Sequence, residues 1–155
     1  MRAPLRKIAI LAGFATDIAG TMISTWAVIV AAVTIRSIQS SEANTTAILS
    51  SWATDRVYII TLMGIGMVWA IAGGFVAGKI AGREPVRHAL WTGVASTVMG
   101  LLFTELQDGG AGITWYILAA TMMTIPCALL GGYLARPTSP QRPVSGSARP
   151  TDSPS

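Results

Sequence analysis

Asp17 is the residue whose type and position could most directly support chemistry in this chain. It lies nine residues after Ile8, where an apolar run begins. At 1.5 Å per residue, this is roughly 13 Å along a helix. An ionised carboxylate at that depth in a membrane costs on the order of 2.5–3.5 kcal/mol. We therefore expect the Asp17 side chain to face the protein interior.

Hydroxyl groups are expected to surround this carboxyl group. Helical spacing places Thr21 and Ser24 on the same face as Asp17. Counting the same depth along the other apolar runs adds Gly73, Ser96 and Cys127 to this layer. The predicted intramembrane polar site is therefore Asp17, Thr21, Ser24 and Ser96. Three roles stay open for Asp17: a neutral acid hydrogen-bonded to a hydroxyl across helices, a proton or cation relay, and a group exposed in a wet cytoplasmic vestibule.

Other reactive residue types are isolated in the sequence. The single histidine, His88, has no acid or thiol close to it, so we expect a solvated side chain or one that contacts lipid headgroups. The single cysteine, Cys127, lies in an apolar run and should be buried and unreactive. Residues 73–79 match the GxxxxGK phosphate-loop core, but Ile80 stands where Ser or Thr is required. We expect no enzyme, cofactor or metal site.

The composition indicates a membrane protein. Of the 155 residues, 52% are hydrophobic and 12% are charged, against about 25% charged in soluble domains. The net charge is +4, yet the cations lie at the ends of apolar runs and do not alternate with aromatic residues. That pattern excludes a nucleic-acid surface and makes the lipid bilayer the first expected partner.

The apolar residues fall into four runs, at about 8–35, 57–80, 89–106 and 113–134. Each reaches the length of ~17–25 residues that crosses a bilayer. A single segment in lipid must satisfy its own backbone groups, which favours helices. We predict an all-α membrane protein with a four-transmembrane-helix bundle over residues 1–135. Residues 136–155 are rich in Pro, Ser, Thr and Arg and should form a disordered cytoplasmic tail.

Charge placement predicts the orientation of the bundle. If the N-terminus is cytoplasmic, two of the eleven cations, Arg36 and Arg56, lie outside. The other nine lie inside: Arg2, Arg6, Lys7, Lys79, Arg83, Arg87, Arg136, Arg142 and Arg149. The positive-inside rule therefore predicts that both termini are cytoplasmic.

The second and fourth runs resemble each other. An offset of 58 residues aligns 71–77 with 129–135 and places Tyr58 on Tyr116. Because these two runs point in the same direction across the membrane, the repeat would be parallel. The sequence predicts a duplicated helical hairpin, with helices one and two forming one copy and helices three and four the other.

Small residues recur at intervals of four in every run, which lets membrane helices approach closely. Two uses stay open for these residues, internal packing of the four helices and a homodimer face on the second helix. The glycines predicted to pack are Gly66, Gly73, Gly74, Gly78, Gly82, Gly93, Gly100, Gly131 and Gly132.

Two short strings resemble a known pattern. Residues 73–82, GGFVAGKIAG, followed by residues 88–93, HALWTG, resemble a pattern in uncharacterised small bacterial inner-membrane proteins with four helices. The resemblance implies the bacterial cytoplasmic (inner) membrane and an unassigned function. It carries over no functional residue.

Two functions follow from these observations as hypotheses. The first is a non-catalytic structural or accessory subunit, within a larger membrane assembly or a homo-oligomer, because small-residue faces occur without a reactive set of side chains. The alternative is a small proton- or cation-coupled transporter or channel that uses Asp17. A polar path from Asp17 to one surface favours transport, whereas a dry, fully hydrogen-bonded Asp17 favours a structural role.

Overall fold

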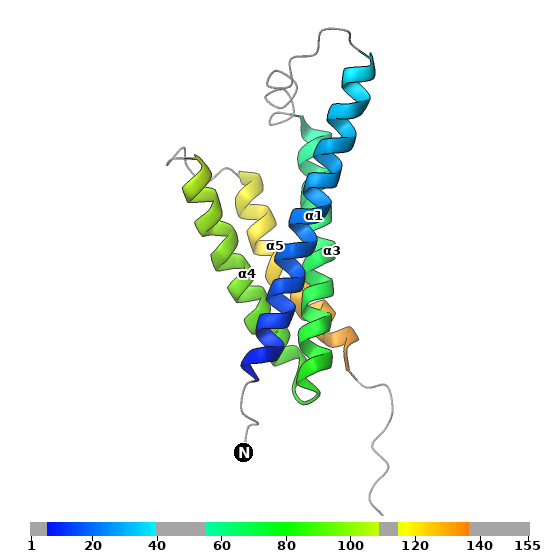
Figure 1. Ribbon diagram of the computed structural model, residues 1–155. Coiled ribbons are helices and arrows are strands. Elements are labelled where there is room, and N and C mark those ends of the chain that lie inside the picture. Colours follow the sequence, from blue (N-terminus) through cyan, green and yellow to red (C-terminus); the bar gives the residue numbers. More distant parts are fainter. Residues whose placement is uncertain (1–5, 40–54, 109–114, 137–155) are drawn as a thin grey trace, which may run out of the picture.

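The computed structural model describes residues 6–39, 55–108 and 115–136, which form four helices (Figure 1). They are α1 (Lys7–Gln39), α3 (Arg56–Ala81), α4 (Pro85–Asp108) and α5 (Trp115–Leu134). The all-helical fold is therefore confirmed. Three helices contain segments long and apolar enough to cross a membrane: Lys7–Ile35, Arg56–Ala81 and Ile117–Leu134. The predicted tail, from residue 137 onward, lies outside the described residues.

The helix α4 differs from the other three in how its polar residues are arranged. It begins at Pro85, where a fixed φ suits the first helical position. Its buried polar residues follow at intervals of four: His88, Thr92 and Ser96. Its most exposed large side chains are apolar, namely Leu90, Trp91, Val98, Leu102 and Phe103. Three of the residues that lower the mean hydropathy of α4 thus face the other helices.

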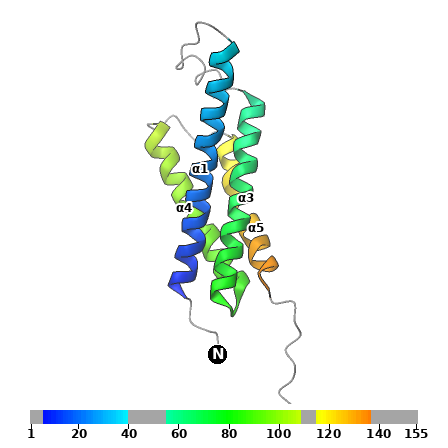
Figure 2. The same cartoon turned by 45° about the vertical axis from the view of Figure 1, so that its right-hand side comes forward.

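The chain direction alternates from helix to helix (Figures 1 and 2). The start of α1, the end of α3, the start of α4 and the end of α5 therefore lie together at one end of the bundle. We call this the cationic end, because it carries Arg6, Lys7, Lys79, Arg83, Arg87 and Arg136. The helix α3 packs against all the others, and most extensively against α5.

Glycines hold the half of the bundle nearer the cationic end together. A methyl group added at Gly73 would lie 2.6 Å from the Gly13 carbonyl oxygen of α1, and one at Gly74 would meet the backbone of α5 at Ala128. Four further predicted glycines make similarly close approaches to another helix: Gly78, Gly93, Gly131 and Gly132. The small-residue faces are therefore used for packing within the chain.

Three of the predicted packing glycines make no such close approach. A methyl group at Gly66, Gly82 or Gly100 would have no atom of another segment within 4 Å. Gly82 ends α3 with a φ of 68°, a conformation that favours glycine. Its N–H donates to the Gly78 carbonyl. Gly66 and Gly100 line a cavity. The interval of four residues correctly places each of these glycines on the small-residue face of its own helix. At Gly66 and Gly100, however, that face contacts no other helix.

The aligned glycines of the predicted repeat have different partners. Gly73 packs against α1, whereas Gly131, its counterpart at the offset of 58, packs against α3. In addition, α3 packs against α4, while α1 and α5 make no comparable contact. The duplicated hairpin stays a prediction from the sequence alone.

Candidate functional site

A cavity of about 430 Å³ lies between all four helices, and we call it the vestibule. Asp17 and Ser96 line its inner end, and Tyr58 and Ile117 line its other end, near the starts of α3 and α5. Tyr58 precedes Gly73, the α3 neighbour of Asp17, by fifteen residues, which is about 22 Å along a helix. The vestibule therefore extends from the level of Asp17 toward the end opposite the cationic end.

Asp17 is buried and yet belongs to the wall of the vestibule. Asp17 is 6% exposed. Its Cβ lies 3.0 Å from the position that a methyl group on Gly73 would occupy. The hydroxyls of Ser96 and Thr21 interact with its carboxyl group. The structure thus brings together three of the four predicted site residues, from α1 and α4.

Two hydroxyl oxygens of residues that line the vestibule have unused hydrogen-bonding capacity. Ser96 Oγ and Thr97 Oγ1 are buried, and neither completes a hydrogen bond of good geometry within the described part of the chain. Both residues line the vestibule. Buried polar side chains are normally hydrogen-bonded, so these two hydroxyls can serve an occupant of the vestibule.

Ser24, the fourth predicted site residue, lies outside this cluster. Its Oγ accepts a hydrogen bond of 2.8 Å from the indole Nε1 of Trp69 in α3. The Trp69 ring lies against Gly20, where no side chain separates the two helices. Ser24 shares a helix face with Asp17, but its hydroxyl group is hydrogen-bonded to Trp69, which is distant in sequence.

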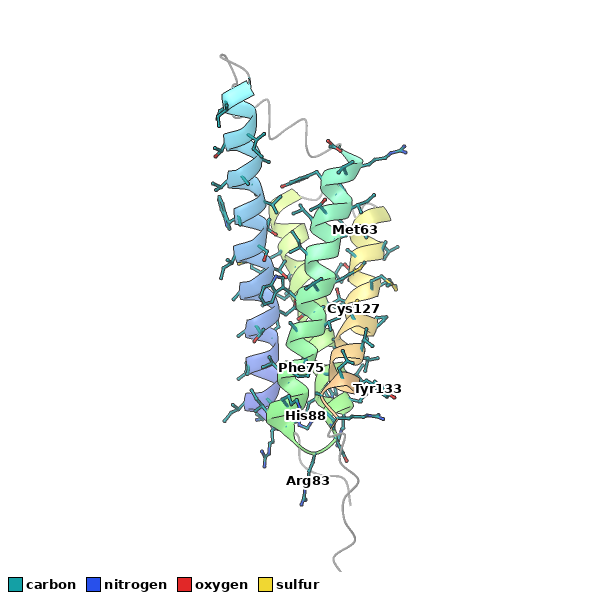
Figure 3. All side chains as sticks on the ribbon, turned by 90° about the vertical axis from the view of Figure 1, so that its right-hand side faces the viewer. Met63, Phe75, Arg83, His88, Cys127 and Tyr133 are labelled. Atoms are coloured by element: carbon teal, nitrogen blue, oxygen red, sulfur yellow. The ribbon has the colours of Figure 1, made fainter. Side chains whose placement is uncertain are left out.

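Cys127 is buried in α5 (Figure 3), as the sequence predicts. It does not line the vestibule. Of the layer predicted around Asp17, the residues that meet it are therefore Gly73 from α3 and Ser96 from α4.

Sequence reasoning missed most of the vestibule wall. Thr97 in α4 and Thr121 in α5 contribute hydroxyls, and Met63 and Met67 in α3 contribute flexible apolar side chains. Thr124 also lines it, and its hydroxyl donates to the Ala120 carbonyl at 3.0 Å. The spacing of Thr121 and Thr124 by three residues, which puts them on one helix face, was an available signal for this part of the site.

His88 closes the cationic end of the bundle (Figure 3). Its residue is 2% exposed, so the expectation of a solvated side chain is wrong. The Arg6 backbone N–H donates to His88 Nε2 at 3.0 Å, and Nδ1 lies 3.1 Å from the Glu84 carbonyl oxygen. A neutral ring protonated at Nδ1 satisfies both contacts. The partner is a backbone group far away in sequence, which no local pattern reveals.

Between Asp17 and the cationic end, the interior is filled by small side chains. In α3 the described residues that line the vestibule all precede Gly73, the neighbour of Asp17, and in α1 and α4 they begin at Asp17 and Ser96. On the other side, Gly13 packs against Gly73, Ala77 and Thr92, and the buried alanines include Ala9, Ala77, Ala81, Ala89, Ala128 and Ala135. Asp17 therefore lies between a half of the bundle whose helices are packed through small residues and the half that contains the vestibule.

His88→Ala should destabilise the protein more than a neighbouring surface change. It removes a buried ring that bonds Arg6 and Glu84, and an unsatisfied buried group costs about 1–3 kcal/mol. Arg87→Ala is the control, because it removes an ion pair to Glu84 at the exposed surface, worth at most about 1 kcal/mol. Thermal unfolding in a mild detergent measures both variants. Equal Tm values for His88→Ala and Arg87→Ala would show that His88 does not stabilise the cationic end of the bundle.

The vestibule can accommodate a positive charge. Asp17 offers a carboxyl group at its inner end, and the described residues that line the cavity include several hydroxyls but no Lys, Arg or His. A proton or a cation could bind there without competition from a neighbouring cationic side chain. Comparison of the chain with protein-family models, with curated proteins and with solved structures found no match.

Proposed function

We propose that this protein is an integral membrane protein that moves a proton or cation by way of Asp17. The observation that carries the proposal is the position of that carboxyl group, which is buried about a third of the way along α1 and lines a cavity of about 430 Å³. Ionisable residues at such depth usually belong to ion or substrate pathways. Binding sites near the midplane are typical of transporters.

The membrane placement supports this proposal. With His88, Thr92 and Ser96 turned inward, α4 presents an apolar surface and serves as the fourth spanning helix. Under the positive-inside rule the cationic end is cytoplasmic, which agrees with the bacterial inner membrane implied by residues 73–93. The vestibule then lies toward the outer side of the membrane, and the half packed through small residues lies toward the cytoplasm.

The structural or accessory function loses its main motivation. That function was inferred from small-residue faces available to a partner protein. Gly73, Gly74 and Gly131 on those faces already pack against helices of the same chain. A buried carboxyl group that served packing alone would gain nothing from a cavity beside it. The vestibule therefore favours transport over the accessory function.

The test is flux across proteoliposomes that contain the purified protein. An imposed proton or monovalent-cation gradient should dissipate faster with the parent protein than in empty vesicles. Asp17→Asn should reduce the flux to the level of empty vesicles, because the amide keeps the shape but cannot exchange a proton or hold a cation. Asp55→Asn is the matched control, since Asp55 caps α3 at the surface and Asn also caps helices well. Unchanged flux in Asp17→Asn, or none in the parent, would remove the proposal.

A further inference from the structure

The walls of the vestibule suit an organic molecule better than a bare metal ion. Apart from Asp17, the lining is largely apolar, with Ile18, Ile59, Leu62, Met63 and Met67 among its members. Cavities of about 300–1,000 Å³ with apolar walls and a few polar groups are typical of small-molecule sites, and this one measures about 430 Å³. Hard cations such as Ca²⁺ and Mg²⁺ instead require about six or more oxygen ligands.

The polar groups are concentrated at the inner end. There the Asp17 carboxyl group faces Ser96, whose buried Oγ has no hydrogen-bond partner of good geometry in the described chain. Among the described residues that line the cavity, Asp17 is the one acidic side chain. An occupant with a positive centre would therefore find its anionic contact at the inner end of the cavity.

We propose that the vestibule binds a hydrophobic organic cation. Its positive centre lies against Asp17 and Ser96, and its apolar body lies along Leu62, Met63 and Met67. Methionine side chains adapt to irregular shapes, so a family of such cations would be accepted. This inference rests on the proposed function, because it names the class of cation that uses the Asp17 site.

A lipid acyl chain is the competing occupant. It would fill the apolar wall equally well, but it has no positive group for the buried carboxyl group. Dependence of binding on the sign of the ligand charge, and on Asp17, therefore separates the two occupants.

The experiment measures binding to the full chain in phosphatidylcholine nanodiscs. The probes are tetraphenylphosphonium and tetraphenylborate, which share size and shape but carry opposite charges. We expect saturable binding of the phosphonium ion to the parent protein and none of the borate ion. Asp17→Asn should weaken phosphonium binding at least about tenfold, since removing one partner of a buried charge pair has large effects. Asp55→Asn should bind like the parent.

Several outcomes would overturn the inference. Equal affinity of Asp17→Asn and the parent would show that the carboxyl group does not hold the cation, and saturable binding of both ions would indicate a lipid-like apolar site. A parent protein that moves protons through Asp17 but does not bind the phosphonium ion would remove this inference and leave the proposed function standing. Asp17-dependent binding without any flux would support the site and remove transport. Ser96→Ala, which leaves the charge in place, should weaken binding less than Asp17→Asn, and the reverse order would contradict the assignment.

Discussion

Gly74→Ala is expected to lower the stability of the bundle clearly, although it adds one methyl group. That methyl group would meet the carbonyl oxygen of Ala128 and lie 2.8 Å from its carbonyl carbon. Backbone atoms cannot rotate away, so α3 and α5 would have to move apart along their most extensive contact. Overpacking of this kind costs about 1–3 kcal/mol, and unfolding in a mild detergent measures the loss.

Gly64→Ala is the matched control for this prediction, because it makes the same substitution in the same helix. A methyl group at Gly64 meets nothing within 4 Å, and alanine in a helix interior is about 0.5–1 kcal/mol better than glycine. This variant should therefore unfold at the Tm of the parent or slightly above it. If the two variants had the same Tm, α3 and α5 could not be packed as the structure has them.

The sequence was informative about whatever depends on the local chain. Apolar length located the helices to within a few residues, as at α3, expected at 57–80 and observed at Arg56–Ala81. An interval of four residues selected Gly73 and Gly74 correctly, because such spacing determines which residues share a helix face. It could not say where that face ends, so Gly66 and Gly100 were assigned to a contact and instead line a cavity.

The site was predictable in its centre and not in its surroundings. Asp17 stood out because charge at that depth requires an explanation, and Ser96 followed from counting the depth in another helix. Ser24 and His88 were misassigned because their partners, Trp69 and Arg6, are far away in sequence. The pairing of hydroxyl and ring groups across helices depends on helix rotation, which periodicity alone does not determine.

The composition of α4 shows the same limit in another form. Average hydropathy treats His88, Thr92 and Ser96 as a cost for a membrane helix, yet these residues face the bundle. Their interval of four residues, with apolar residues between them, indicates an inward polar face. A window average discards that periodicity, and it also counts the surface residue Arg87 at the start of the helix.

Gly66→Phe should abolish Asp17-dependent flux while leaving the protein folded. Gly66 lines the vestibule, and a side chain added there meets nothing within 4 Å at its Cβ. A phenyl ring can therefore enter the cavity without displacing a helix, and it would lie between Asp17 and the outer end lined by Tyr58. The expected result is flux at the level of empty vesicles and loss of phosphonium binding, with a Tm close to that of the parent.

Gly64→Phe provides the control from the same helix, two residues away. Gly64 is exposed and does not line the vestibule, so a ring there adds the same bulk to the outer surface and should leave flux unchanged. Retention of full flux in Gly66→Phe would mean that the route to Asp17 does not pass through the vestibule. Equal loss in both variants, with equal Tm, would instead point to a general disturbance of α3. A selective loss in Gly66→Phe would link the cavity to the movement of the cation, because the buried carboxyl group itself is unaltered.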